Sequence, residues 1–350
     1  MTKIQNVNVA SFQKLITPKE ILKAIPLPKE SEKTVLQARQ VLQNIIKHKD
    51  KRKFMIVGPC SIHDPEAAKE YAARLLLLAK KVEKHLFLVM RTYFEKPRTT
   101  VGWKGYVNDP FLNNTFDVGE GLLRSRRLLC DITKLGLPVA TEALDPIVPQ
   151  YVSDLICWTA IGARTTESQT HREMASGLSS PVGFKNNTDG NISVAINAMK
   201  SAEQKHWFLG IDQEGCTSVV ETRGNHCCHL ILRGGAKGPN YDSVSINQAE
   251  LALQKAGLNP AIVVDCSHDN SKKDYTLQPL VLSDCINQII SGNKSIVGFM
   301  IESNLNAGNQ PLGADLEYGV SITDGCIDWS NTENMVFSAF NRIRNLVDFG

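Results

Sequence analysis

Three features are scarce in this 350-residue sequence: excess charge of one sign, long hydrophobic runs and paired cysteine motifs. The 39 basic and 36 acidic residues leave a formal net charge of +3, which is too small to indicate binding to nucleic acid or to an anionic membrane. The longest apolar stretch, residues 75–79, lies in an amphipathic helical pattern and is far shorter than the ~18 residues of a membrane span.

The cysteines and the N-terminus give no sign of secretion. The nine cysteines are odd in number and include no Cys-x-x-Cys pair, which favours reduced thiols over a disulfide framework. The first 20 residues lack the apolar core of a signal peptide. Hydrophobic residues at 42% and charged residues at 21% exclude a disordered or fibrous chain. The sequence therefore predicts a globular cytoplasmic protein that binds neither nucleic acid nor membrane.

Short apolar segments recur along the chain from residue 54 onward. Eight of them have the length of a buried strand: residues 54–57, 86–90, 138–141, 158–163, 181–184, 229–232, 261–265 and 296–301. Helical patterns separate most of them: residues 66–84, 119–135, 190–202, 244–257 and 277–291. Continuous apolar strands that alternate with helices are typical of parallel strands joined by crossover helices. Eight such strands favour an α/β fold of the closed (β/α)8 TIM barrel type over an open doubly wound sheet.

Three segments lie outside this alternation. Residues 1–50 form an N-terminal extension, with a capping-box helix start at residues 17–20 and an amphipathic helix over 31–48. Residues 207–211 and 218–222 predict a β-hairpin inserted at about 206–223. Residues 332–347 predict a closing helix. We therefore expect an arm and helix over 1–50, which serve oligomerisation or regulation, and a catalytic barrel over 51–350.

Polar side chains follow every predicted strand, and in a barrel these strand ends meet at one rim, where active sites lie. Six of them are cations: Arg91, Lys96, Arg98, Arg164, Lys185 and Arg233. Like charges in one cavity repel, so collecting them costs stability unless anions occupy the space. Guanidinium groups also match carboxylate and phosphate in shape. The rim therefore predicts a ligand with several negative charges; the alternative is that half of these cations pair with neighbouring Asp and Glu residues.

A second group at the rim mixes sulfur, nitrogen and oxygen donors. It comprises Cys60, His268, Glu302 and Asp324. A thiolate, an imidazole and two carboxylates suit a divalent transition metal such as Mn, Fe, Co or Zn better than Mg. No local spacing supports the site, because these residues lie far apart in the sequence. Simpler interpretations are that Cys60 is a small buried side chain, His268 a general base and Glu302 an ion-pair partner.

Longer motifs surround these residues and carry a resemblance to a known family. They are Gly58-Pro59-Cys60-Ser61-Ile62-His63-Asp64-Pro65, Tyr93 with Glu95-Lys96-Pro97-Arg98-Thr99-Thr100 and Lys104-Gly105, Gly162-Ala163-Arg164-Thr165-Thr166-Glu167-Ser168-Gln169, Pro181-Val182-Gly183-Phe184-Lys185-Asn186, Arg233-Gly234-Gly235 and Ser321-Ile322-Thr323-Asp324. Over nearly its whole length, the sequence resembles the class I microbial 3-deoxy-D-arabino-heptulosonate 7-phosphate (DAHP) synthases. Motifs of this length are highly specific.

The resemblance implies a metal-dependent condensation of phosphoenolpyruvate with erythrose 4-phosphate and water, which yields DAHP and phosphate in the first step of the shikimate pathway. It implies that one divalent metal is held by Cys60, His268, Glu302 and Asp324. It implies that phosphoenolpyruvate is bound by Arg91, Lys96, Arg164, Lys185 and Arg233. It assigns erythrose 4-phosphate to Lys96, Pro97, Arg98 and Thr99, with Arg98 on its phosphate.

The candidate catalytic residues are Lys96, Glu142, Lys185 and His268. Lys96, shared by both substrates, is expected to donate a proton to the developing alkoxide; the alternative is that it acts only as an electrostatic clamp. Glu142 is expected near the water that attacks phosphoenolpyruvate. Two residues depart from the family pattern: Asn187 replaces a usual Gly but tolerates a positive φ, and Asp269 adds a carboxylate where a small residue is usual.

The resemblance also implies feedback inhibition by one aromatic amino acid. The expected effector cavity comprises Asn8, Pro149, Gln150, Leu178, Ser179, Phe208, Gly210 and Val220. Tyrosine is favoured over phenylalanine, because the motifs around residues 141–146 and 264–268 are most similar to the tyrosine-sensitive isoenzymes and Gly210 leaves room for a phenolic hydroxyl. The alternative is an ordinary core pocket in an unregulated enzyme. The resemblance further implies a homotetramer or homodimer in which the arm crosses a subunit interface.

Three other functions stay open. One is another phosphoenolpyruvate-condensing barrel synthase, against which the loop at residues 96–100 and the hairpin argue. Another is a Schiff-base aldolase, in which Lys185 would react covalently. The last is an inactive effector-binding or scaffold subunit, which the complete set of expected site residues disfavours.

Overall fold

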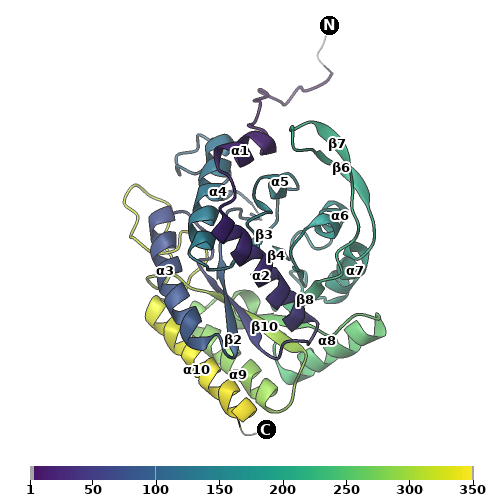
Figure 1. The fold of residues 1–350 in the computed structure, drawn as a ribbon, viewed down its shortest axis with the longest axis vertical. Helices are drawn as coiled ribbons and strands as arrows, with labels where there is room; N and C mark the ends of the chain where they lie inside the picture. Colours follow the sequence, from purple (N-terminus) through teal and green to yellow (C-terminus); the bar gives the residue numbers. More distant parts are fainter. Residues whose placement is uncertain (1–3, 99, 349–350) are drawn as a thin grey trace.

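Eight parallel strands close into a barrel in a computed structural model that describes residues 4–98 and 100–348 (Figure 1). Around the barrel the order is β1-β10-β9-β8-β5-β4-β3-β2. The strands are β1 (Lys53–Gly58), β2 (Leu86–Arg91), β3 (Val139–Glu142), β4 (Trp158–Ile161), β5 (Val182–Lys185), β8 (Cys228–Leu232), β9 (Ile262–Asp265) and β10 (Ile296–Glu302). All eight apolar segments of the sequence are strands, so the predicted (β/α)8 barrel is confirmed.

Helices cover the outside of the barrel between successive strands. They are α3 (Pro65–Val82), α4 (Val118–Lys134), α5 (Pro149–Val152), α6 (Gln169–Gly177), α7 (Ser193–Ala202), α8 (Ser243–Lys255), α9 (Gln278–Ile290) and α10 (Trp329–Asp348). Two short 3-10 helices, η1 (His268–Ser271) and η2 (Tyr275–Leu277), lie between β9 and α9. The sequence pattern did not indicate α5 or α6. The first is a single turn, and the second buries too few apolar side chains to show a helical period.

The strands alternate between two hydrophobic layers. In β1, Phe54 and Ile56 belong to the core inside the barrel, whereas Met55 and Val57 pack with the surrounding helices. Successive side chains of a strand point to opposite faces, which explains this separation. Because both faces are covered, the strands are apolar without interruption, and this is why the sequence pattern located them so well.

Helix α2 (Lys29–Ile46) closes the barrel at the end where the strands begin. Its Val35 and Leu42 side chains belong to the same buried cluster as the barrel interior. Arg39 fixes the helix against the entry to β4, since its guanidinium donates to the carbonyl oxygen of Ile156 at 3.0 and 2.8 Å. Figure 1 shows α2 lying across the strands. The opposite end of the barrel, where the strands finish, is therefore the end available for a site.

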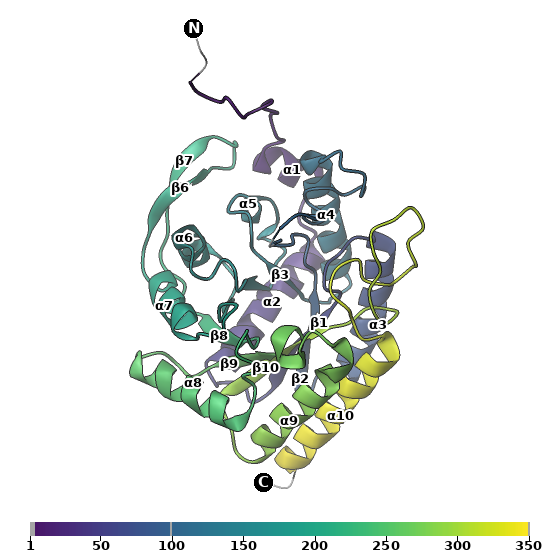
Figure 2. The ribbon, with the colours of Figure 1, turned by 180° about the vertical axis from the view of Figure 1, so that it is seen from behind.

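The N-terminal segment and the inserted hairpin meet outside the barrel. Helix α1 (Pro18–Ala24) begins with the predicted capping box between Thr17 and Glu20. Strands β6 (Trp207–Ile211) and β7 (Thr217–Glu221) pair in antiparallel fashion, as the sequence predicted. The backbone N–H of Lys19 donates to Gln213 at the hairpin turn. Figures 1 and 2 show the hairpin running outside α6 toward α1.

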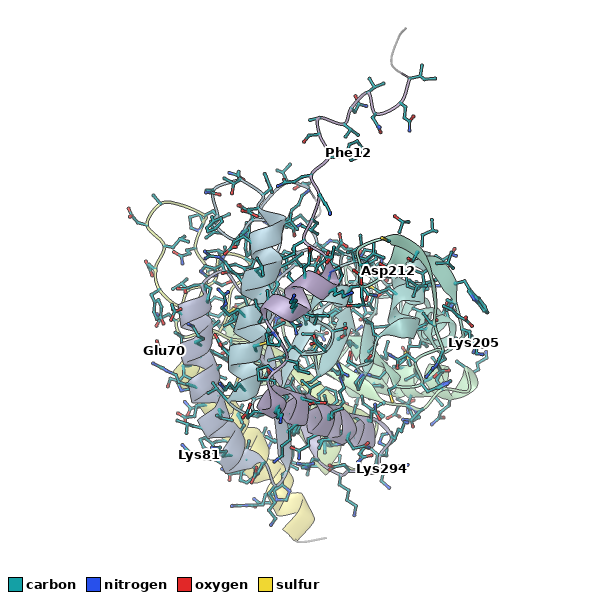
Figure 3. The ribbon with its side chains drawn as sticks, turned by 45° about the horizontal axis from the view of Figure 1, so that its top comes forward. Phe12, Glu70, Lys81, Lys205, Asp212 and Lys294 are labelled. Carbon is teal, nitrogen blue, oxygen red and sulfur yellow. The ribbon has the colours of Figure 1, made fainter. Side chains whose placement is uncertain are left out.

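Residues 4–13 extend away from the body in every view, whereas Leu15 and Ile16, just before α1, pack against it. Figure 3 shows Phe12 on this arm, beyond the elements that surround the barrel, and its side chain is 82% exposed. Asp212, by contrast, lies at the hairpin turn near α1 in the same view. Among the described residues, no helix combines the length and the apolar character that crossing a bilayer requires.

Candidate active site

A cavity of about 490 Å³ lies at the carboxyl ends of the barrel strands. All six predicted cations line it: Arg91, Lys96, Arg98, Arg164, Lys185 and Arg233. Arg91 and Lys185 are the last residues of β2 and β5, and both are buried. Parallel strands bring their carboxyl ends to one rim, so barrel closure gathers residues that lie far apart in the sequence.

Two of these cations contact the group with mixed donors. The Arg91 guanidinium donates to Glu302 at 3.0 Å and to the carbonyl oxygens of Pro59 and Cys60. The Lys96 ammonium lies 3.0 Å from the Cys60 sulfur and 3.8 Å from an Asp324 oxygen. Burial opposes the charge of Lys96, but Cys60 and the nearby carboxylates outweigh burial and raise its pKa. Lys96 is therefore a cation within reach of both the sulfur and the cavity.

Two other cations pair with carboxylates from the β9 end. Lys185 donates to Asp265 at 3.0 Å, and Arg233 forms an ion pair with Asp269. Burial opposes ionisation of Asp265, yet His268 and Lys185 hold its pKa well below the usual range. The sequence left open whether these cations line a cavity or pair with neighbouring carboxylates. In the structure they do both.

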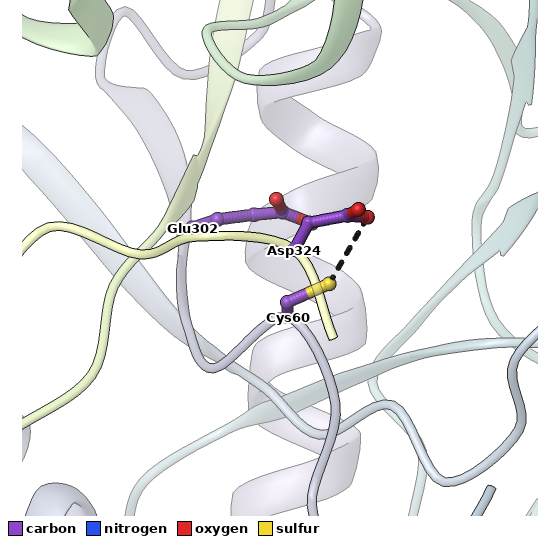
Figure 4. A group of neighbouring side chains, drawn as sticks. All are labelled: Cys60, Glu302 and Asp324. Atoms are coloured by element: carbon purple, nitrogen blue, oxygen red, sulfur yellow. Dashed lines mark hydrogen bonds between the residues drawn. The ribbon is translucent and has the colours of Figure 1, made fainter. Parts of the chain in front are cut away.

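Three of the four predicted metal ligands form a compact group. Ligand atoms of Cys60, Glu302 and Asp324 all lie within 4.8 Å of one another (Figure 4). Burial raises the pKa of the Cys60 thiol to about 11; Glu302 adds to this rise and Lys96 opposes it. With this pKa the thiol keeps its proton at neutral pH even beside Lys96, and binding of a metal ion would displace that proton. The donor set therefore fits a divalent transition metal.

His268 lies next to this group, with one ring nitrogen already engaged. Its Nδ1 is 2.9 Å from Asp265 and 2.7 Å from the Ser267 hydroxyl, while its Nε2 is 3.9 Å from Glu302. A carboxylate on one ring nitrogen of a histidine commonly fixes the other nitrogen toward a metal. The backbone φ of His268 is +56°, a left-handed conformation that is uncommon in residues other than Gly.

The other predicted substrate and catalytic residues surround the same space. Glu142 ends β3; it is 7% exposed, and among the described residues its Oε1 has no hydrogen-bond partner. Pro97 and Arg164 line the cavity. Arg98 lines both this cavity and an adjacent one on the outer side of its loop. Thr99 lies outside the described residues.

A second cavity lies behind Glu142 and contains part of the predicted effector set. Pro149, Leu178 and Ser179 line it together with Glu142 and Glu95. Gln150 lies beside the hairpin, since its side chain accepts a hydrogen bond from Gln213 at 3.1 Å.

The remaining effector residues lie on the hairpin and the arm. Phe208 and Val220 are paired across the hairpin, and a Cβ atom built on Gly210 would lie 2.8 Å from Val220. Asn8 is exposed on the arm. The hydrogen bond between Gln150 and Gln213 links the hairpin to α5, next to Pro149 at the cavity, whereas Asn8 is on a segment that extends away from the body.

Three carboxylates near the site were not among the predicted site residues. Asp265 is the last residue of β9, and Asp269 follows the predicted histidine in η1; their place at the carboxyl end of a strand was the signal that could have found them. Glu95 is 4% exposed and accepts a hydrogen bond from the backbone of Asp145. Burial, with a further effect of Asp145, raises the pKa of Glu95 to about 8. Spacing alone could not indicate this burial.

Comparisons with known proteins point to one family. The model of the DAHP synthetase I family matches residues 27–336. A phospho-2-dehydro-3-deoxyheptonate aldolase of Salmonella typhimurium, described as Tyr-sensitive, is 53% identical over 336 residues, which cover 95% of this chain and 94% of the relative. A Phe-sensitive enzyme of the same name from Escherichia coli is 49% identical over 341 residues, 97% of each chain. The solved structure of the aldolase of this name from Francisella tularensis superposes with a TM-score of 0.95 at 48% identity and covers 96% of this chain and 99% of its own.

Proposed function

This chain belongs to the DAHP synthetase I family, and on that premise we propose that it is a metal-dependent DAHP synthase. The reaction joins phosphoenolpyruvate, erythrose 4-phosphate and water and yields DAHP and inorganic phosphate. The observation that carries the proposal is the combination of a sulfur- and carboxylate-lined group with six converging cations in one cavity. Two phosphates and a carboxylate in the substrates need such a cation cluster, whereas a neutral ligand would leave it uncompensated.

The cations divide between the two substrates in this proposal. Phosphoenolpyruvate is held by Arg91, Lys96, Arg164, Lys185 and Arg233, and erythrose 4-phosphate by Lys96, Pro97, Arg98 and Thr99. Arg91 and Lys185 are held in place by ion pairs with the buried carboxylates of Glu302 and Asp265. Such preorganised charges orient two anions without the cost of rearranging at the moment of reaction.

Cys60, His268, Glu302 and Asp324 would hold the metal, and their donor atoms suit Mn, Fe, Co or Zn. When bound, the metal supplies a Lewis acid for the aldehyde group of erythrose 4-phosphate. Lys96, a cation beside the Cys60 sulfur, holds the proton that the aldehyde oxygen takes up as carbon 3 of phosphoenolpyruvate attacks. The alternative role of Lys96, an electrostatic clamp on both substrates, would require the same position beside Cys60.

Glu142 would orient the water that adds to carbon 2 before phosphate leaves. Its unpartnered carboxylate oxygen is buried at the cavity wall, where it can accept a hydrogen bond from that water. Lys185 would support this step by placing its positive charge beside the leaving phosphate. His268 would contribute an imidazole whose orientation is fixed by Asp265. Because the Lys185 ammonium donates to Asp265, binding of an anion suits Lys185 better than Schiff-base chemistry does.

We also propose feedback inhibition by an aromatic amino acid, with tyrosine favoured. The Tyr-sensitive relatives of this chain are 52–53% identical and a Phe-sensitive one is 49% identical, which gives tyrosine modest support. The effector would bind in the second cavity, between Pro149, Leu178 and Ser179 and the inner face of the hairpin. Asn8 would come from another subunit of a homodimer or homotetramer in the cytoplasm, because its own arm extends away from this region.

A phosphate-release assay tests the activity. Purified protein is mixed with phosphoenolpyruvate, with and without erythrose 4-phosphate, before and after treatment with EDTA. We expect phosphate only when both substrates are present, loss of release after chelation and recovery on addition of Mn²⁺. Release from phosphoenolpyruvate alone would indicate a phosphatase, and release that survives chelation would overturn the metal-dependent reaction. Borohydride added during turnover should leave Lys185 unmodified; a trapped adduct would instead support a Schiff-base aldolase.

A further inference from the structure

The ion pairs of the cation cluster are not equivalent. Glu302 and Asp265, the partners of Arg91 and Lys185, have side chains only 3% and 1% exposed. Asp269, the partner of Arg233, is 25% exposed and lines the cavity itself. A buried carboxylate cannot leave its cation without being stranded in a medium of low dielectric, whereas a carboxylate at a cavity wall can turn into water. Of these three pairs, only the one between Arg233 and Asp269 can exchange its anion.

The backbone around this pair is fixed, so the Asp269 side chain is the part that can move. The backbone N–H groups of Asp269 and Asn270 both donate to the Arg233 carbonyl, at 3.2 and 3.3 Å. Gly234 adopts a φ of +73°, and a Cβ atom there would lie 2.6 Å from the Asp269 backbone. Asn270 is buried and its side chain donates to the backbone of Leu232 and of Asp265.

Arg233 also has donor capacity that Asp269 does not use. The pair is made by one terminal nitrogen of the guanidinium, and among the described residues the buried Nε of Arg233 has no hydrogen-bond partner. Leaving a buried donor unsatisfied is costly, and it indicates a partner that comes from outside the chain. The cavity is where such a partner would arrive, because Arg233 lines it.

We propose that Asp269 is a resident counter-anion for Arg233, which the anionic part of phosphoenolpyruvate must displace, so that Asp269 weakens substrate binding. This inference rests on the proposed function, since it assigns Arg233 to phosphoenolpyruvate. The ion pair and the substrate compete for the same N–H groups, and only the difference between the two interactions contributes to affinity. Arg91 and Lys185 keep their buried carboxylate partners when substrate binds.

The test compares Asp269→Asn and Asp269→Ala with the parent, all supplied with Mn²⁺. Removal of the competing charge should lower KM for phosphoenolpyruvate by about fivefold, which corresponds to about 1 kcal/mol for a partly exposed pair. The effect should fall on KM for phosphoenolpyruvate rather than on KM for erythrose 4-phosphate. Asp284→Asn is the matched control, because it removes one negative charge from the exposed face of α9, away from the cavity. It should leave both constants unchanged.

Direct binding separates this inference from the proposed function. Inorganic phosphate titrated calorimetrically into Mn²⁺-loaded protein should bind the Asp269 variants about fivefold more tightly than the parent. That result would support the counter-anion even if no variant formed DAHP. An unchanged or higher KM together with unchanged or weaker phosphate binding would overturn the proposal, and weaker binding would instead make Asp269 a residue that positions Arg233. Thermal melting of each variant verifies that the fold is retained.

Discussion

The two cavities that meet at Glu142 differ in what builds them. The larger one is lined by cations and acids from the ends of barrel strands, and closure of the barrel alone brings these together. The smaller one has no basic residue in its lining, which is divided between apolar side chains and serines, threonines and two glutamates, and its predicted ligand set also requires the hairpin and an arm that extends away from the body. The difference teaches that the proposed chemistry needs only the barrel, whereas the proposed regulation also needs the segments added to it.

Replacing Cys60 should have the largest effect on activity, because the reaction proposed for the larger cavity needs the metal that Cys60 would help to bind. Cys60→Ala removes the sulfur donor, and we expect phosphate release to fall more than about 100-fold, with less metal retained per chain after dialysis. Cys216→Ala is the control, since that cysteine is exposed at the hairpin turn. Full activity and full metal content in Cys60→Ala would contradict the assignment.

Substitutions of Lys96 distinguish proton donation from a purely electrostatic role in the larger cavity. Lys96→Ala should lower kcat by about 100- to 10,000-fold if the ammonium donates the proton. Lys96→Arg retains the charge but not the compact donor, so it should stay nearly as impaired. Steady-state kinetics with both substrates decide the matter. Recovery of most activity in the Arg variant would favour the electrostatic clamp instead.

Glu95 lines the smaller cavity, and its raised pKa predicts how the free energy of unfolding depends on pH. The pKa rises from 4.5 in the unfolded chain to about 8 in the fold, so between these values the folded protein binds a proton that the unfolded chain has lost. The free energy of unfolding should therefore fall as pH rises from 5 to 8, by at most about 1.4 kcal/mol per pH unit from this group.

Urea unfolding of Glu95→Gln and the parent at several pH values checks this. Glutamine carries no such proton, so the variant should gain stability relative to the parent as pH rises through this range. Glu120→Gln, on the more accessible surface of α4, should show no such trend. A stability difference between Glu95→Gln and the parent that is constant from pH 5 to 8 would contradict the raised pKa.

Gly210 should give the smallest effect, confined to regulation. Gly210 is paired with Ser218, and a Cβ atom there would lie 2.8 Å from a methyl group of Val220, so a larger residue forces that side chain to shift. Gly210→Ser should therefore raise the tyrosine concentration needed for half-inhibition by about tenfold, with uninhibited turnover retained. Leu209→Ser, on the opposite and exposed face of β6, is the control. Inhibition curves for tyrosine, phenylalanine and tryptophan provide the measurement; unchanged tyrosine inhibition would place the effector elsewhere.

The same contrast explains what the sequence could reveal. Strands such as residues 54–57 and 296–301 are buried on both faces, so their continuous apolar runs could be recognised in the sequence. Barrel topology then predicted that the residues after these strands lie at one rim. The sequence named Asp269 as an added carboxylate but not as the partner of Arg233, and it indicated neither the pairing of Asp265 with Lys185 nor the burial of Glu95, because these depend on side-chain packing rather than on periodicity. Asn8 could be named only by resemblance, since it is exposed on the arm and no pattern in the sequence indicates what it contacts.

Anomalous X-ray diffraction from crystals grown with Mn²⁺ tests the central claim most directly. The account predicts one strong peak per chain, within bonding distance of the Cys60 sulfur, the Glu302 and Asp324 carboxylates and the His268 imidazole, at the edge of the cation-lined cavity. A peak elsewhere in the barrel, or no peak at this group while the crystallised protein still forms DAHP, would contradict it.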